Sequence, residues 1–216
     1  MKKYILFDLD GTLTDPADGI IKSIKYSLNK LDIAEYDEGI LTQFIGAPLA
    51  KAYAKYFGFD EEKAKYAVSL YREYFNEKGI FENYIYNGIP ELLEKLYNDG
   101  YTLAVATLKP TEAAKRILAH FDLAKYFTVV AGSDPTKTSE TKADIIANAI
   151  NMLNIEDKSL SAMVGDREHD MFGSTENGID SIGVLYGYGG QEELANAGAK
   201  MIAKTAADVY DLIKNK

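Results

Sequence analysis

The N-terminal stretch Tyr4-Ile5-Leu6-Phe7-Asp8-Leu9-Asp10-Gly11-Thr12 runs from apolar residues into a turn that carries two acids. A short continuous apolar run is typical of a strand buried on both faces, as in a parallel sheet, and the glycine favours a turn at its end. Similar runs recur at 102–107, 127–131, 162–164 and 181–184. Helical spacing of apolar residues lies between them, at 89–96, 113–121 and 145–153. This alternation predicts an α/β fold with a doubly wound, Rossmann-like parallel sheet.

The stretch 16–86 interrupts that alternation. Its apolar residues follow helical spacing, as in Ile20, Ile24 and Leu28, and it contains no strand-like run. We therefore expect a small all-α domain at 16–86, inserted into an α/β core formed by residues 1–15 and 87–216.

Composition excludes several classes of function. The 216 residues contain no Cys, which removes disulfides, thiolate nucleophiles and iron–sulfur clusters. The formal net charge of −9 disfavours binding to a nucleic acid polymer or to an anionic membrane surface. The apolar run after Met1-Lys2-Lys3 is too short for a signal peptide or a membrane span, so we expect a cytoplasmic protein.

Polar residues gather where the predicted strands end. Ligands of open α/β sheets bind beyond the carboxyl ends of the strands, so these residues are candidates for one site. They are Asp8, Asp10, Thr107, Lys109, Asp166 and Asp170, together with Lys142 at the start of a predicted helix. Several carboxylates at one edge of the sheet repel one another unless a cation lies between them. Because all the candidate ligand atoms are oxygens, Mg²⁺ is the favoured cation.

A divalent cation, a lysine and a threonine hydroxyl around one phosphoryl group suit phosphoryl transfer, which depends on positioning and charge neutralisation. An ionised Asp is available as the nucleophile. A second carboxylate could protonate the leaving alkoxide and later accept a proton from water.

The same residues resemble, in order and spacing, the four motifs of the haloacid dehalogenase superfamily of phosphatases. The resemblance rests on Asp8-Leu9-Asp10-Gly11-Thr12, on Thr107, on Lys142 and on Gly165-Asp166-Arg167-Glu168-His169-Asp170. It covers the whole chain, and the helical insert at 16–86 resembles the family's cap domain. Two positions depart from the common pattern, Leu108 in the second motif and Ala143 after the lysine of the third.

This resemblance implies roles for individual residues. Asp8 would be the nucleophile that forms an aspartyl-phosphate, and Asp10 the general acid and base. Thr107 and Lys142 would hold the transferring phosphoryl group. Mg²⁺ would be bound by Asp8, by the backbone carbonyl of Asp10 and by Asp166, with Asp170 as a further ligand or as the partner of one.

Three segments narrow the resemblance to a branch of phosphoglycolate phosphatases and 5′-nucleotidases: Phe44 to Leu49, Gly165 to Met171 and Gly183 to Gly189. The prediction is a Mg²⁺-dependent phosphatase for a small phosphomonoester. One alternative is a phosphomutase of the same superfamily, similar to β-phosphoglucomutase. Another, from a different class, is a non-enzymatic module like a response regulator.

Lys109, Gly46 and Arg72 are further candidates for substrate binding. Lys109 follows Thr107, Gly46 precedes a predicted helix whose first amides could contact an anion, and Arg72 could reach a distal charge. Each also has a structural explanation as a surface or turn residue. His169 is set aside, because Asp10 already accounts for proton transfer. The expected assembly is a monomer or a weak homodimer.

Overall fold

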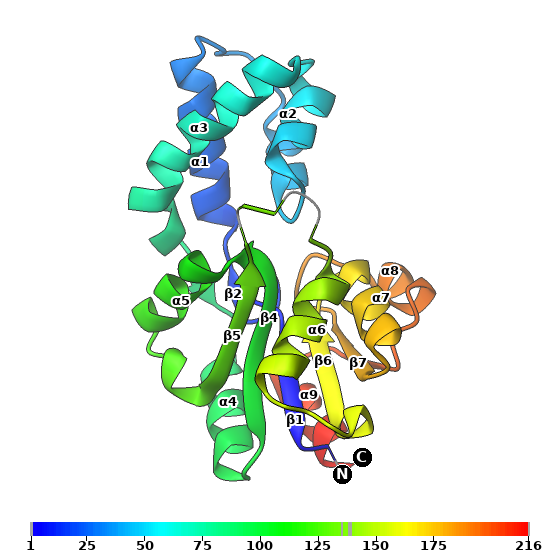
Figure 1. The fold of residues 1–216 in the computed structure, drawn as a ribbon. Coiled ribbons are helices and arrows are strands. Elements are labelled where there is room, and N and C mark those ends of the chain that lie inside the picture. Colours follow the sequence, from blue (N-terminus) through cyan, green and yellow to red (C-terminus); the bar gives the residue numbers. More distant parts are fainter. Residues whose placement is uncertain (1, 135, 138–139, 216) are drawn as a thin grey trace. The chain divides into compact units, whose positions relative to one another are not determined.

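A computed structural model describes residues 2–134, 136–137 and 140–215 (Figure 1). The chain divides into two compact units, one formed by Met1–Thr14 and Ile85–Lys216 and the other by Asp15–Tyr84. The sequence-based boundaries lay after residues 15 and 86. The first unit is called here the α/β unit and the second the helical unit.

The α/β unit contains a six-stranded sheet in the order β5-β4-β1-β6-β7-β8, in which all neighbouring strands are parallel. The strands are β1 (Tyr4–Phe7), β4 (Thr102–Pro110), β5 (Phe127–Ser133), β6 (Ser161–Gly165), β7 (Asp180–Val184) and β8 (Met201–Ala203). The prediction of an α/β fold with a doubly wound parallel sheet is confirmed. The edge strand β8 was not predicted, because three residues are too few for a recognisable pattern.

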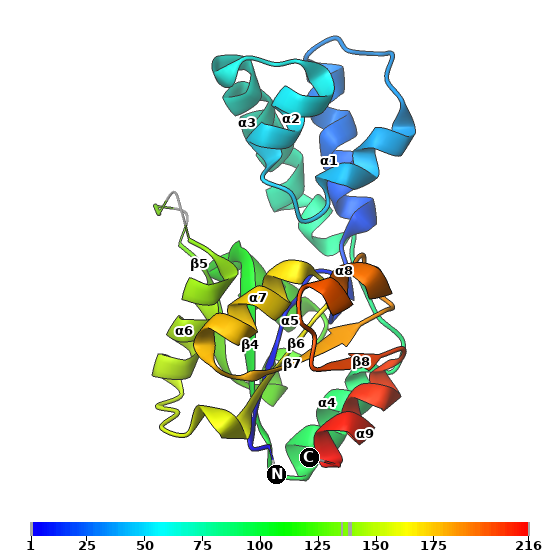
Figure 2. The same cartoon turned by 90° about the vertical axis from the view of Figure 1, so that its right-hand side faces the viewer.

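Helices cover both faces of this sheet (Figures 1 and 2). They are α4 (Ile89–Asn98), α5 (Thr111–His120), α6 (Lys142–Met152), α7 (Glu168–Asn177), α8 (Gln191–Asn196) and α9 (Ala206–Lys214). Short 3₁₀ turns precede β5 and β6, at Ala124–Tyr126 and Lys158–Leu160. On one face α6 packs against β4 and β5, and α7 packs against β6 and β7. Helix α4 packs against α9 and β4.

The start of α6 matters for the site, since it places Lys142. The Thr141 hydroxyl accepts from the Asp144 amide and the Asp144 carboxylate accepts from the Thr141 amide, which is a capping box. Ile145, Ile146 and Ala149 of the same helix are buried against the sheet. The cap and the apolar face together fix the helix that carries Lys142.

The helical unit contains α1 (Ala17–Lys30), α2 (Leu49–Phe57) and α3 (Glu61–Glu77), with 3₁₀ helices at Glu38–Phe44 and Gly79–Phe81. Its core is rich in aromatic side chains. Phe44 packs on Tyr53 with ring centroids 5.0 Å apart, and Tyr53 stacks on Phe59 at 5.8 Å. Acids mark the start of α3, where the Asp60 side chain accepts from the Lys63 amide.

Two details differ from the sequence-based expectation. The strands β2 (Thr14–Asp15) and β3 (Tyr84–Ile85) pair with each other, although no strand was expected within 16–86. Two-residue strands carry no periodicity that a sequence could reveal. Strand β4 continues to Pro110 with an irregular register after Ala106, so Lys109 lies within the strand rather than after it. None of the helices described is both long and apolar enough to span a bilayer.

Candidate active site

Asp8 follows β1 directly and begins the turn that closes the strand. The Asp8 amide donates to the carbonyl of Val164 at 2.9 Å, which ties the turn to β6. Gly11 has a φ of +85°, a conformation that glycine adopts without strain. A Cβ at Gly11 would lie 2.2 Å from Oδ2 of Asp166, so only glycine lets this turn approach that carboxylate.

Asp166 follows β6 and is completely buried. Its Oδ1 accepts from the Thr12 hydroxyl at 3.1 Å, and its Oδ2 accepts from the Tyr188 amide at 2.9 Å. A Cβ at Gly187 would lie 2.4 Å from Cβ of Asp166. The carboxylate is therefore held between the turn after β1 and the loop after β7.

Lys142 connects two of the acids. Its Nζ lies 2.8 Å from Oδ1 of Asp8, 2.8 Å from Oδ1 of Asp170 and 2.9 Å from the carbonyl oxygen of Ala106. The two contacts with carboxylates are ion pairs, and the contact with Ala106 is a hydrogen bond donated by the ammonium. The other oxygen of Asp170, Oδ2, accepts from the Arg167 amide at 3.1 Å. Lys142 thus holds Asp8 and Asp170 in place from within the protein.

Asp8, Asp166 and Asp170 form a cluster in which one carboxylate oxygen of each lies within 4.8 Å of the others. Burial, followed by the charges of Asp170 and Asp8, raises the pKa of Asp166 to about 7. Burial also raises the pKa of Asp170 to about 6, although Lys142 opposes the shift. Burial alone would lower the pKa of Lys142, but the charges of Asp170 and Asp8 prevail and raise its pKa.

Three acids face one ammonium in this cluster, so negative charge exceeds positive charge. A divalent cation would remove the excess, and buried carboxylate oxygens are the ligands that hard cations prefer. Asp8, Asp166 and Asp170 could therefore hold a metal ion.

The carboxylate of Asp10 is not part of this cluster. Its Oδ2 contacts Nζ of Lys109, while its Oδ1 is buried and has no hydrogen-bond partner among the described residues. The Thr107 hydroxyl, also buried, accepts from the Lys109 amide at 3.2 Å. Lys109 is a predicted substrate contact, and in this structure its ammonium contacts Asp10.

This geometry can be set beside known proteins. The family model of the haloacid dehalogenase-like hydrolases matches residues 5–184. The chain belongs to this family. The match spans β1 to β7 and so includes all the carboxylates described above.

Relatives of this hydrolase include proteins of more than one described activity. A 5′-nucleotidase of Pseudomonas aeruginosa is 44% identical over 88% of this chain and 86% of that protein. The tyrosine-protein kinase PtkA of Mycobacterium tuberculosis is 37% identical over 87% of this chain, which covers only 63% of that protein. The crystal structure of a predicted phosphatase from Clostridium acetobutylicum is 48% identical, with a TM-score of 0.90 and full coverage of both chains.

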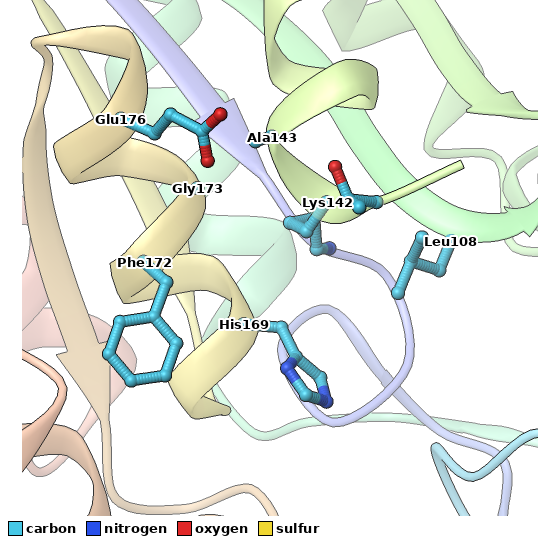
Figure 3. A pocket seen from close by; sticks show the side chains of 8 residues that line it. Leu108, Lys142, Ala143, His169, Phe172, Gly173 and Glu176 are labelled. Atoms are coloured by element: carbon cyan, nitrogen blue, oxygen red, sulfur yellow. The ribbon is translucent and has the colours of Figure 1, made fainter. Parts of the chain in front are cut away.

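A hollow of ≈ 290 Å³ in the hydrolase adjoins Lys142 (Figure 3). Its wall is formed by Leu108, Thr141, Lys142, Ala143, His169, Phe172, Gly173 and Glu176. Leu108 and Phe172 are 38% and 52% exposed, and His169 is exposed as well. The side chains of Leu108, His169 and Phe172 are therefore accessible at the surface beside α6 and α7.

Gly46 and Arg72 belong to the helical unit. Gly46 has a φ of +77° and precedes α2, and Arg72 is an exposed residue of α3. They are not members of the carboxylate cluster, and their contact with substrate stays a prediction.

Sequence reasoning about this hydrolase missed the residues that hold Asp166. Thr12 was quoted as part of a motif without a role, and the amide of Tyr188 and the close approach of Gly187 were not anticipated. The alternation of aromatic residues and glycines at 186–189 was the available signal, because glycines at such spacing indicate close approach of the main chain.

Proposed function

We propose that this hydrolase cleaves small phosphomonoesters in a Mg²⁺-dependent reaction, with Asp8 as the nucleophile. The observation that carries the proposal is the buried cluster of Asp8, Asp166 and Asp170 with Lys142 bound to two of its members. The names of the 5′-nucleotidase and of the Clostridium acetobutylicum protein support a phosphatase.

Asp8 is suited to attack phosphorus. Its contacts with the described residues go to Oδ1, which accepts from the Leu9 amide at 2.7 Å and lies 2.8 Å from Nζ of Lys142. These contacts orient the carboxylate and leave Oδ2 to form the bond to phosphorus. Mg²⁺ held by Asp8, Asp166 and Asp170, with the Asp10 carbonyl, would neutralise charge on the phosphoryl oxygens.

The reaction then has two halves. In the first, Oδ2 of Asp8 bonds to phosphorus, the ester P–O bond breaks, and the leaving alkoxide takes a proton from Asp10. In the second, Asp10 accepts a proton from water as the water oxygen attacks phosphorus, and the bond to Asp8 breaks to release phosphate. Thr107 and Lys142 are proposed to hold the phosphoryl group during both halves.

The helical unit is proposed to act as a cap that excludes bulk water, with Gly46 and Arg72 as candidate contacts to the leaving group. The proposed substrates are small anionic esters, of the kind hydrolysed by phosphoglycolate phosphatases and 5′-nucleotidases. We also propose that the enzyme is cytoplasmic and acts as a monomer or a weak dimer.

A panel of esters tests the proposal. Phosphoglycolate, nucleoside 5′-monophosphates, sugar phosphates and p-nitrophenyl phosphate are incubated with Mg²⁺ or with a chelator, and released phosphate is measured. We expect release only with Mg²⁺, and none from Asp8→Asn. Isomer formation from a hexose phosphate without phosphate release would favour a mutase, and normal turnover by Asp8→Asn would contradict the role of Asp8.

A further inference from the structure

Tyr186 lies in the loop between β7 and α8, next to the residues that hold Asp166. The following residue, Gly187, packs so closely that a Cβ would lie 2.2 Å from the Gly11 carbonyl oxygen and 2.4 Å from Cβ of Asp166. Tyr188 donates its amide to Asp166 at 2.9 Å. Tyr186 is therefore anchored beside the acid cluster by the main chain that follows it.

The hydroxyl of Tyr186 is buried and has no hydrogen-bond partner among the described residues. Its ring packs against Tyr86 with centroids 5.1 Å apart and an interplanar angle of 54°. Tyr86 is itself tied to the turn after β1, since its amide donates to the Leu13 carbonyl at 3.2 Å. A buried hydroxyl without a partner is costly, so a folded protein that keeps one has a reason to do so.

The nearby acid does not supply the missing acceptor. Asp166 accepts from the Thr12 hydroxyl and from the Tyr188 amide, whereas the Tyr186 hydroxyl has no partner among the described residues. Burial and the charge of Asp166 raise the pKa of Tyr186, so the hydroxyl keeps its proton and stays a donor at neutral pH. A molecule that binds at this place could supply the acceptor.

We propose that Tyr186 is a ligand-binding residue of this hydrolase, donating a hydrogen bond to an oxygen held at the cluster of Asp8, Asp166 and Asp170. This inference rests on the proposed function. Two sources could supply the oxygen, a water molecule that arrives with the divalent cation or the phosphate itself. Both present an oxygen that accepts a hydrogen bond, and the two can be separated by experiment.

The test compares Tyr186→Phe with the wild type by isothermal titration calorimetry of the full chain. The first titration uses Mg²⁺ alone, and the second uses inorganic phosphate at saturating Mg²⁺. Loss of one hydrogen bond should weaken binding by about three- to tenfold. Weaker Mg²⁺ binding identifies water as the partner, and weaker phosphate binding alone identifies phosphate. Tyr97→Phe, at a surface position of α4 that is 53% exposed, controls for the loss of a tyrosine hydroxyl.

Thermal unfolding without ligand separates binding from a structural role. Because Tyr186→Phe removes an unpaired buried hydroxyl, its melting temperature without ligand should equal or exceed that of the wild type. The proposal is overturned if both dissociation constants stay within about twofold of the wild type, or if the variant melts earlier without ligand. Failure of the wild type to bind Mg²⁺ and phosphate would overturn the proposed function too, whereas normal binding that Tyr186→Phe leaves unchanged would overturn this inference alone.

Discussion

The ammonium of Lys109 contacts Oδ2 of Asp10, and both groups are largely shielded from solvent, at 7% and 24% side-chain exposure. The irregular end of β4 brings Lys109 to this position. The proposed general acid and base is therefore held by a lysine outside the metal cluster, with its other oxygen, Oδ1, left without a partner among the described residues. We therefore predict that Lys109 positions Asp10 for proton transfer.

Replacement of Lys109 by Met should lower kcat by about tenfold, the equivalent of about 1.4 kcal/mol, because one charge-assisted hydrogen bond to Asp10 is lost. The same replacement in an Asp10→Asn background should have little further effect, because the group that Lys109 orients is already altered. Steady-state kinetics with p-nitrophenyl phosphate give both values. An equal loss in the two backgrounds would show that Lys109 acts on the substrate instead.

Replacement of Lys142 by Met should destabilise the metal-free protein by about 3 kcal/mol, because it leaves buried carboxylates without their cation. Added Mg²⁺ should recover part of this loss by taking over the neutralisation of charge. Denaturant unfolding with and without Mg²⁺ measures both effects. Lys65→Met is the matched control, because the exposed pair of Lys65 with Glu61 contributes little. Equal stability of the Lys142 variant and the control would refute this account.

Replacement of Gly187 by Ala should weaken Mg²⁺ binding by about tenfold or more, because the new Cβ would collide with Asp166 and displace it. Gly190→Ala should bind normally, since no atom lies within 4 Å of its Cβ position and its φ is −85°. Calorimetric titration with Mg²⁺ compares the two variants. Unchanged affinity in Gly187→Ala would mean that this loop does not set the position of Asp166.

The affinity for Mg²⁺ should rise with pH from 5 and level off above about 7, since protons compete with the cation for Asp166, whose pKa is raised to about 7.

The stability of the metal-free protein should change with pH in the opposite direction. A carboxyl that holds its proton more tightly when folded loses its stabilising contribution as pH rises through the folded pKa. Melting temperatures between pH 5 and 8 should therefore fall with pH without Mg²⁺, and less so in Asp166→Asn. A melting temperature of the metal-free wild-type protein that stays constant between pH 5 and 8 would contradict the prediction.

Much of the site was predictable because its residues follow strand ends. Asp8 and Asp166 each come directly after an apolar run, and parallel strands bring their carboxyl ends to one edge of the sheet. Lys142 was predictable as the first residue of a helix. The contact of Lys109 with Asp10 was not, since it depends on an irregular register that follows from the pairing of β4 with β5.

The order of apolar runs and acids in the chain was enough to predict a parallel sheet, the family motifs and the acids that could form the cluster, because an apolar run and the acid that follows it are neighbours in the sequence. Tertiary structure alone decided how those acids are held. The amide of Tyr188 donates to Asp166, and Gly187 packs closely against it, although both lie far from Asp166 in the sequence. Every residue other than proline has a backbone amide, so the type of residue does not indicate what that amide binds. Only the folded structure decides which distant carboxylate it contacts.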